Sequence, residues 1–400
     1  MNQCKKPIYA AGIIGFELFI VVLSPLLVVA RILYTLLNWE RMSVWTGAPI
    51  LTLSRKAASE RLLGVRAISI VRQSYYITND FDFDILRATR GNAIGAFLLT
   101  YITFMWICIA AKRVHTFADG GLLPSLKRRE FSLVEMAMYK LLRIRQFVWV
   151  YGADVRTRSK TVALGEPNCC TNCTEINVAC ICDQAKADSN MRRLSHTAIA
   201  IFSMGDMIEY TPGSYNQLYF WPLDLTADSG ARYIPVYPAN DRALNLRVVH
   251  APNHRAFKGT LHLETAVKKL RDEGVKIELI MVEKIPNAQA LTIYRSADVI
   301  FDQCMIGFHG YFAIEAMALG KPVMCFIRKP EDYLLAPDEC PIINTHVTTL
   351  MEDLRYLAHE GRSTLPAIGR RGREYVARYY TEQAFSQRLA IAYREYGVTA

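Results

Sequence analysis

The stretch from residue 297 to residue 323 constrains the fold of this chain more than any other. An apolar run that predicts a strand is followed by a glycine loop, a helix, a stop signal and a second strand: Val299–Phe301, Gly307–Gly310, a helix from about Tyr311, Gly320–Pro322 and Val323–Ile327. A helix that follows one strand and leads directly into another is typical of parallel sheets, whose strands need crossover connections. The stretch therefore predicts an α/β fold.

The loop and the helix of this stretch also predict a ligand. Glycine has no Cβ, so Gly307 and Gly310 let a ligand approach the backbone closely. The helix that the loop opens would point free N–H groups at that ligand, which suits a phosphate. Glu315 follows about one turn later, where its carboxylate can accept hydrogen bonds from the hydroxyls of a ribose. We therefore predict a nucleotide diphosphate site that includes Gly307, Phe308, His309, Gly310 and Glu315.

A longer pattern surrounds these residues. The sequence EAMALGKPV at residues 315–323 follows an Ala-Asp pair, an apolar strand and a Gly-x-x-Gly loop. This arrangement resembles the donor-site signature of GT-B glycosyltransferases, in particular the family-4 retaining enzymes (glycosyl transferases group 1). The resemblance implies two Rossmann-like domains that face a cleft, a nucleotide diphosphate sugar as donor substrate, and retention of configuration without an obligatory metal. Family members carry two glutamates eight positions apart; Glu315 matches the second, and Gly307 stands in place of the first.

A second part of the same site is predicted upstream. Leu246–His250 predicts a strand, Thr260–Glu273 predicts a helix, and the loop between them carries Arg255, Lys258 and Gly259. Arginine chelates phosphate oxygens, and lysine adds a point charge. The loop resembles the family's Arg…Lys-Gly pair, which implies that Arg255 and Lys258 are catalytic residues holding the donor diphosphate beside Gly259. The alternative is a pair of solvated basic residues.

The N-terminal half shows the same alternation of strands and helices. Pro49–Leu53 and Ala67–Val71 predict strands, and Lys56–Leu63 predicts the helix between them. Ala93–Ala111 carries no charge and is long enough to span a membrane. We favour a buried or membrane-lying helix there, because a span would separate the next strand, Arg113–Phe117, from the first two.

Candidate site residues follow two strands of this half. His115 and Asp119 flank the end of one strand, and Asp154 and Arg156 follow the strand that ends at Tyr151. In open α/β sheets ligands gather at the carboxyl ends of the strands. His115 resembles the family's N-domain histidine that faces the sugar, so His115 and Asp119 are predicted as catalytic; Asp154 and Arg156 resemble its HGSD segment and would face the cleft. The alternatives are a loop-forming His–Asp pair and a mutual salt bridge between Asp154 and Arg156.

Five of the ten cysteines cluster at residues 169–182. Cys170 and Cys173 have the spacing of a zinc knuckle, and Cys180 and Cys182 supply two more thiolates. Four thiolates can close a tetrahedral structural zinc site. Such a site would pin an insertion and take no part in catalysis. The alternative is a loop of ordinary cytosolic cysteines, because the remaining cysteines are scattered, as in a reducing compartment.

The composition indicates that the protein associates with a membrane. Hydrophobic residues make up 52% of the chain and the mean hydropathy is +0.11, which suits an enzyme that also touches a bilayer. Residues 8–30 contain one charge, Glu17, and one proline, Pro25, so they are long and apolar enough to span. More positive charge follows this segment than precedes it, which favours a cytoplasmic body. A removed signal peptide and an in-plane helix are the alternatives.

The predicted organisation has four parts: an N-terminal membrane anchor (1–38), an acceptor-side Rossmann-like domain (39–226) with the Cys-rich insertion 169–182, a linker (227–245), and a nucleotide-sugar donor domain (246–400). The formal charge of +10 suits anionic lipid head groups or anionic substrates. Nucleic acid is not expected as a partner, because the chain has no zinc-finger, helix-turn-helix or aromatic RNA-binding pattern.

These features predict a membrane-associated glycosyltransferase. It would move a sugar from a nucleotide diphosphate sugar to a lipid-linked or polysaccharide acceptor at the cytoplasmic face of the plasma (inner) membrane. No cofactor is expected to be obligatory for catalysis, and the one metal that the sequence suggests is a structural zinc ion. Two alternatives remain: a non-catalytic GT-B-like protein that binds a nucleotide sugar or scaffolds polysaccharide assembly, and a GT-B-fold epimerase.

Overall fold

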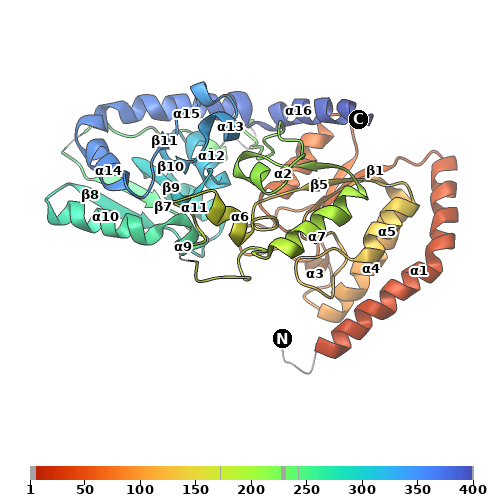
Figure 1. Cartoon of the computed structure of the whole chain (residues 1–400). Helices are drawn as coiled ribbons and strands as arrows, with labels where there is room; N and C mark the ends of the chain where they lie inside the picture. Colours follow the sequence, from red (N-terminus) through yellow and green to blue (C-terminus); the bar gives the residue numbers. More distant parts are fainter. Residues whose placement is uncertain (1–5, 172, 227–230, 242, 399–400) are drawn as a thin grey trace.

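The computed structural model of the chain describes residues 6–171, 173–226, 231–241 and 243–398. Parts of the predicted anchor (1–5), linker (227–230 and 242) and donor domain (399–400) lie outside the described residues. Two parallel β-sheets, each covered by helices, lie side by side (Figure 1). The predicted α/β architecture with two parallel sheets is confirmed.

The first sheet has six strands in the order β3-β2-β1-β4-β5-β6, and every neighbouring pair is parallel. Its strands are β1 (Met42–Thr46), β2 (Ala67–Val71), β3 (Phe83–Asp84), β4 (Ala111–Phe117), β5 (Arg145–Trp149) and β6 (Ala198–Phe202). The helices of this half are α1 (Lys6–Leu36), α2 (Thr52–Arg61), α3 (Ile85–Ala88), α4 (Ala93–Ala110), α5 (Leu133–Leu141), α6 (Arg158–Ala163) and α7 (Gln184–Ser195). Helices on its faces bury the central strands, as parallel sheets require.

The prediction of a first strand at Pro49–Leu53 is wrong. The strand is β1, Met42–Thr46, and all five of its residues are buried. A strand that is buried on both faces has no alternation of apolar and polar residues, so its pattern is weak. Pro49 has no N–H to donate to a ladder, and Thr52 already begins α2.

The second sheet has five parallel strands in the order β11-β10-β9-β7-β8. Its strands are β7 (Leu246–His250), β8 (Ile277–Met281), β9 (Val299–Gly307), β10 (Val323–Ile327) and β11 (Ile343–Asn344). Its helices are α9 (Arg255–Lys258), α10 (Thr260–Asp272), α11 (Asn287–Tyr294), α12 (Tyr311–Ala318), α13 (Pro330–Tyr333), α14 (Leu350–Ala358), α15 (Leu365–Tyr379) and α16 (Glu382–Glu395). Short 3-10 turns lie at Gly205–Glu209, Ala231–Tyr233, Pro337–Glu339 and Glu360–Thr364.

The last helix returns to the first sheet. α16 runs along the top of Figure 1 to the first half of the chain, where it packs on α2. There the Tyr393 hydroxyl donates to Glu60 Oε1 at 2.7 Å and lies 3.0 Å from His115 Nε2. All three side chains are buried. The contact therefore joins residues more than 270 positions apart and holds the two halves together.

We expect Tyr393→Phe to lower the free energy of unfolding by about 1–3 kcal/mol, because it leaves the buried Glu60 carboxylate short of a donor. Tyr396→Phe is the matched control, since Tyr396 follows the same helix and is partly exposed. Denaturant unfolding of both variants checks the prediction. Equal stabilities of the two variants would contradict it.

Two helices of the described residues, Pro7–Leu36 and Ala93–Ala110, are long and apolar enough to cross a membrane by length and composition. The first, within α1, is a candidate membrane segment, with a mean hydropathy of 2.6 over its most apolar window. The second, α4, buries Phe104 and Ile107 in one core cluster with β1, β2 and β4. α4 is therefore a helix of the first sheet's own core.

Candidate functional site

A cleft of about 740 Å³ lies between the two sheets, at the carboxyl ends of their strands. The first half contributes residues that follow β1, β2, β4, β5 and β6, and the second half contributes residues that follow β7, β8 and β9. Those used below are Tyr75, Arg129, Tyr151 and Arg156 on one wall and Lys258, Phe308, His309, Gly310 and Glu315 on the other. The structure thus brings most of the predicted donor-site residues to one cavity.

Lys258 lies at the end of the short helix α9 and reaches into this cleft. Its ammonium pairs with Asp302 on β9, and the other oxygen of Asp302 accepts a hydrogen bond from Gly310 N at 2.5 Å. Burial favours the neutral acid, but the Lys258 charge and these hydrogen bonds outweigh it and lower the pKa of Asp302. Gly259 has a φ of +75°, which lets the chain turn from α9 into α10 directly after Lys258. The buried Asp302 carboxylate therefore binds both the Lys258 ammonium and the backbone at the start of α12.

The N-terminus of α12 opens at the same wall. Gly310 is its N-cap residue, and the N–H groups of the first helical turn have no partner within the helix. His309, just before it, is 2% exposed, and burial lowers its pKa to about 4. The neutral ring places Nδ1 3.3 Å from the carbonyl oxygen of Gly310, which puts the proton on Nδ1. Nε2 is then an acceptor, and it has no partner among the described residues.

Glu315 lies one turn further along α12 and also lines the cleft. Its Oε1 accepts from the Tyr233 hydroxyl at 3.0 Å and from Asn287 Nδ2 at 3.0 Å. Burial raises the pKa of Glu315 to about 7 in spite of these hydrogen bonds. The carboxylate is therefore held in place by two neutral donors and changes its charge near neutral pH.

The opposite wall carries a second polar group. Asp119 follows β4 and accepts hydrogen bonds from the Tyr151 hydroxyl at 2.7 Å and from Arg129 Nη1 at 3.2 Å. Tyr151 and Arg129 both line the cleft. Burial raises the pKa of Asp119 above its usual value although both partners oppose this. The predicted residue Asp119 therefore lies directly behind the cleft wall.

The comparisons with known proteins concern the fold. No protein-family model matches the sequence, and no curated protein matches it. Among solved structures, HepE from Anabaena in complex with UDP is similar with a TM-score of 0.54 and 11% identity over 89% of this chain and 100% of that one. Sucrose-phosphate synthase from Thermosynechococcus elongatus gives 0.53 and 12% over 89% and 98%. OtsA, solved in its apo form, gives 0.51 and 8% over 88% and 98%.

The chain has a GT-B glycosyltransferase-like fold. The predicted GT-B architecture is thereby confirmed, whereas these low identities carry no residue-by-residue assignment.

Three predicted donor residues, Arg255, Gly259 and Gly307, are not among the residues that line the GT-B cleft. Arg255 is largely exposed and pairs with Glu264 and with Glu283, whose Oε2 lies 2.9 Å from Arg255 Nη1. It starts the short helix that Lys258 ends, and its two surface glutamates hold its side chain away from the buried Asp302 that pairs with Lys258. Gly307 is the last residue of β9, with a φ of +99°, and its carbonyl accepts from Arg328 N. The cleft wall on this side therefore includes Lys258 and residues 308–310.

His115 does not reach the cleft either. It is 1% exposed, stacks on Trp45 at 3.8 Å between ring centroids, and accepts a hydrogen bond from Trp149 Nε1 at 3.0 Å. Its predicted role facing the sugar finds no support, because aromatic rings cover it on the cleft side. Arg156 lines the cleft and pairs with Asp206 at 2.7 Å.

Asp154, also predicted to face the cleft, instead turns toward the backbone. It is 2% exposed and accepts from the N–H groups of Tyr151 and Gly152 at 2.9 and 3.0 Å. Burial and the Asp119 charge raise its pKa to about 7. The alternative, a mutual salt bridge between Asp154 and Arg156, does not form either, because each residue has its own set of partners.

The cysteine cluster does not form the predicted zinc site. Among the described residues, no three His, Cys, Asp or Glu side chains lie together in a way that could hold a metal ion. The thiols have other partners: Cys173 and Cys182 Sγ accept from the N–H groups of Glu175 and Asn177, and Cys170 and Cys180 are buried. The insertion instead reaches the second half, where Glu175 lies 3.2 Å from His254.

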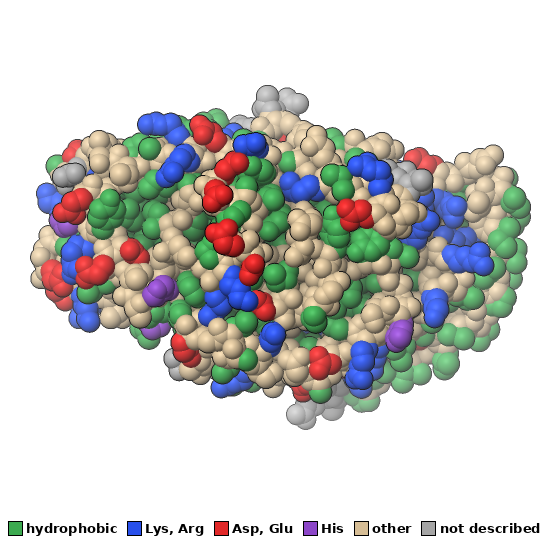
Figure 2. Space-filling view, turned by 45° about the horizontal axis from the view of Figure 1, so that its top comes forward, with side chains coloured by type: hydrophobic (Ala, Val, Ile, Leu, Met, Phe, Trp, Pro, Cys, Tyr) green, Lys and Arg blue, Asp and Glu red, His purple; other side chains and the backbone are tan. Residues whose placement is uncertain are grey.

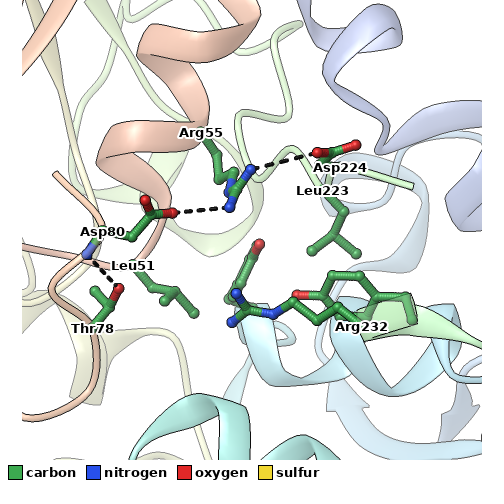
Figure 3. Close-up of a pocket in the computed structure, with 9 residues that line it drawn as sticks. Leu51, Arg55, Thr78, Asp80, Leu223, Asp224 and Arg232 are labelled. Atoms are coloured by element: carbon green, nitrogen blue, oxygen red, sulfur yellow. Dashed lines mark hydrogen bonds and ion pairs between the residues drawn. The ribbon is translucent and has the colours of Figure 1, made fainter. Parts of the chain in front are cut away.

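A smaller pocket adjoins the GT-B cleft, and Figure 3 shows its side chains. Arg55 of α2 points between Asp80, at 2.9 Å, and Asp224, at 3.7 Å. Arg232 lies below them and donates to Asn287, which in turn holds Glu315. Sequence reasoning missed Tyr233, Asn287 and Asp302, which position the two predicted residues Glu315 and Lys258. Of these three residues, only Asp302 could have been found from the sequence, because an acidic residue inside an apolar strand is unusual.

Proposed function

We propose that this protein is a glycosyltransferase that moves a sugar from a nucleotide diphosphate sugar to a lipid-linked or polysaccharide acceptor at the cytoplasmic face of the membrane. The observation that carries the proposal is the grouping of Lys258, the N-terminus of α12 and Glu315 on one wall of the cleft. A cation, a helix N-terminus and a carboxylate in this order match the diphosphate and ribose of a nucleotide. Donor binding would occupy the domain from residue 246 onward.

The chemistry required of the chain is electrostatic. During transfer the bond between the anomeric carbon and the phosphate oxygen breaks, and the nucleoside diphosphate leaves with the electron pair. The Lys258 ammonium and the N–H groups of α12 would stabilise the growing negative charge on that leaving group. Asp302 keeps the ammonium in position, and His309 Nε2 offers an acceptor to a sugar hydroxyl. No metal is needed for these steps.

The acceptor would enter from the opposite wall. Asp119, Tyr151 and Arg129 form one hydrogen-bonded group there, and the acceptor hydroxyl must lose a proton when its oxygen attacks. A carboxylate that burial makes more basic suits the role of proton acceptor. We assign this role to Asp119, which the acceptor proton would reach through the Tyr151 hydroxyl that lines the cleft. Retention of configuration follows the family resemblance and is part of the proposal; it requires the acceptor oxygen to attack the anomeric carbon from the face on which the diphosphate leaves.

A uridine nucleotide is the first donor to test. HepE, one of the similar structures, is described in complexes with UDP and with UDP-glucose. We expect calorimetry of detergent-solubilised protein to show micromolar binding of one among the UDP-, GDP-, ADP- and TDP-sugars. The same donor should be consumed when lipid-linked and saccharide acceptors are supplied. Absence of nucleotide binding by the folded protein would refute the proposal.

One observation favours a second candidate function. Gly307 stands where the family carries its first glutamate, and among the described residues the one carboxylate that lines this wall is Glu315, which matches the second glutamate. The alternative is a non-catalytic protein that binds a nucleotide sugar or scaffolds polysaccharide assembly. It predicts donor binding without transfer or hydrolysis at any acceptor concentration. Detection of a transferred sugar that is lost in Asp119→Asn would exclude it.

A further inference from the structure

The outer face of α1 is apolar and uncovered. Ile13, Ile20 and Leu27 face inward and are buried, whereas the opposite face of the helix is exposed, with Ile8 and Val22 each 75% exposed. In Figure 2 hydrophobic side chains line the right-hand edge of the molecule, where Figure 1 places α1. A face of this length needs an occupant in an aqueous cell.

α1 also packs lengthwise on the first half of the chain. Tyr9 contacts Phe97 near the start of α4, with 5.6 Å between ring centroids, and Arg31 donates to the Cys108 carbonyl near its end at 3.0 Å. From Tyr9 to Arg31 the helix is about 33 Å long, as long as the hydrocarbon core is thick. The two helices run parallel, and both lead into neighbouring strands of the first sheet.

This packing decides the orientation of α1. If α1 crossed a bilayer, α4 and the start of α5 would lie at hydrocarbon depth beside it. The start of α5 is polar: Ser132 donates to Glu17 of α1 at 2.5 Å and also caps α5. Loops and open sheet edges are not tolerated in contact with lipid tails. The helix must therefore lie along the membrane surface, with its exposed apolar face toward the bilayer.

Basic residues surround both ends of this face. Arg72, Arg87 and Arg90 are exposed near the start of α4, next to Ile94, which is 76% exposed. At the other end, burial and neighbouring cations lower the pKa of Lys112, and two of these neighbours, Arg41 and Arg145, are not buried. Figure 2 shows Lys and Arg side chains beside the hydrophobic edge. Cations at both ends of an apolar face match anionic head groups around inserted side chains.

We infer that α1, with the exposed edge of α4, lies in the plane of an anionic membrane leaflet and does not span it. Both halves of the protein and the N-terminal end of α1 are then on one side of the membrane. This inference rests on the membrane association that is part of the proposed function, and it specifies how the protein is oriented on the membrane. The β2–β3 loop carries both Arg72 and the cleft residue Tyr75, so the cleft opens close to the head groups. A lipid-linked acceptor can reach it from the same leaflet.

The first experiment tests the side on which the N-terminal end lies. An epitope is placed before Lys6 and a second one after the last residue, and inverted membrane vesicles are treated with protease. We expect both epitopes to be digested without detergent. Protection of the N-terminal epitope until detergent is added would overturn the inference in favour of a span.

The second experiment tests whether an anionic membrane covers the apolar face of α1. Binding of the protein is measured by flotation with vesicles of phosphatidylcholine alone or with 30% phosphatidylglycerol. We expect binding at least tenfold tighter to the anionic vesicles, and a loss on the order of tenfold in Arg87→Ala/Arg90→Ala. Lys268→Ala/Lys269→Ala, on exposed positions of α10, is the matched control and should bind like the unchanged protein. Val22→Glu/Leu26→Glu should lose binding to both vesicle types.

Nucleotide binding, measured on the same preparations, separates this inference from the proposed function. A variant that binds its nucleotide sugar but no vesicles retains a folded cleft. Its loss of vesicle binding then comes from the substituted membrane face and not from unfolding. Unchanged protein that binds nucleotide but neither vesicle type would overturn the inference and leave the proposed function standing. A stable dimer that hides α1 and does not float would overturn it as well.

Discussion

Lys258→Met is expected to reduce kcat/KM for the nucleotide-sugar donor by about 10²–10³-fold. The substitution removes the one lysine ammonium that the structure places in the cleft among the described residues. On this wall of the cleft, the N-terminus of α12 would then have to stabilise the charge that develops on the leaving diphosphate without a lysine ammonium beside it. Single-turnover transfer with saturating acceptor measures the loss in the chemical step, and calorimetry measures the loss in donor binding.

The same substitution leaves Asp302 buried without its partner, so stability must be separated from chemistry. We expect Lys258→Met alone to lower the free energy of unfolding by about 3–5 kcal/mol, because an uncompensated carboxylate stays in the core. Lys258→Met/Asp302→Asn should recover most of this stability and none of the activity. Activity that returns with stability in the double variant would show that Lys258 acts only through the fold.

Arg255→Met is the matched control for this series. Arg255 is three positions away on the same short helix, exposed, and paired with two glutamates on the surface. Exposed ion pairs contribute little, so we expect kcat/KM to change less than about fivefold. A loss as large as that of Lys258→Met would mean that Arg255 leaves its glutamates and enters the cleft when the donor binds.

Donor binding is expected to weaken as the pH falls below about 7, and this dependence should disappear in Glu315→Gln. The buried Glu315 has its pKa raised to about 7. Ribose hydroxyls donate hydrogen bonds, and a protonated acid loses part of its capacity to accept them. Below pH 7 the dissociation constant should therefore rise by up to about tenfold per pH unit, while Glu315→Gln binds weakly at every pH. Calorimetry from pH 5 to pH 8 checks this.

The folding equilibrium gives an independent measure of the same group. A raised acid pKa means that the folded protein holds this proton between about pH 4.5 and pH 7, where the unfolded chain has released it. Stability should fall by about 3 kcal/mol as the pH rises through that window. Glu315→Gln should lack this part of the pH dependence. Identical pH profiles for the two proteins, in both binding and unfolding, would remove Glu315 from the donor site.

Much of the second sheet could be predicted from local sequence. Val323–Ile327 and Leu246–His250 are strands with the predicted bounds, and α12 begins at Tyr311 as predicted. Short apolar runs, glycine loops and a Gly-Lys-Pro stop act within a few residues, so a single sequence reveals them. The strand before the loop is longer than predicted, because β9 continues through Asp302 to Gly307.

The predictions that failed or found no support concern contacts between distant residues. His115 lies near the carboxyl end of β4, where catalytic residues often occur, but α16 returns over it from the end of the chain and buries it. The cysteines have the spacing of metal ligands, but their thiols pack in the core or accept local N–H groups. Strand β1 was missed because burial on both faces removes the alternation that would reveal it.

The sequence by itself determined the α/β alternation, the glycine loop before α12 and the apolar length of α1, since each depends on neighbours in the chain. Only the tertiary structure decided that Lys258 faces the cleft and Arg255 does not, because Asp302 holds one and two surface glutamates hold the other. Only the packing of α1 along α4 decided how the apolar helix can meet a membrane. Side-chain direction, burial and charge pairing depend on residues that fold next to each other, and these lie dozens to hundreds of positions apart.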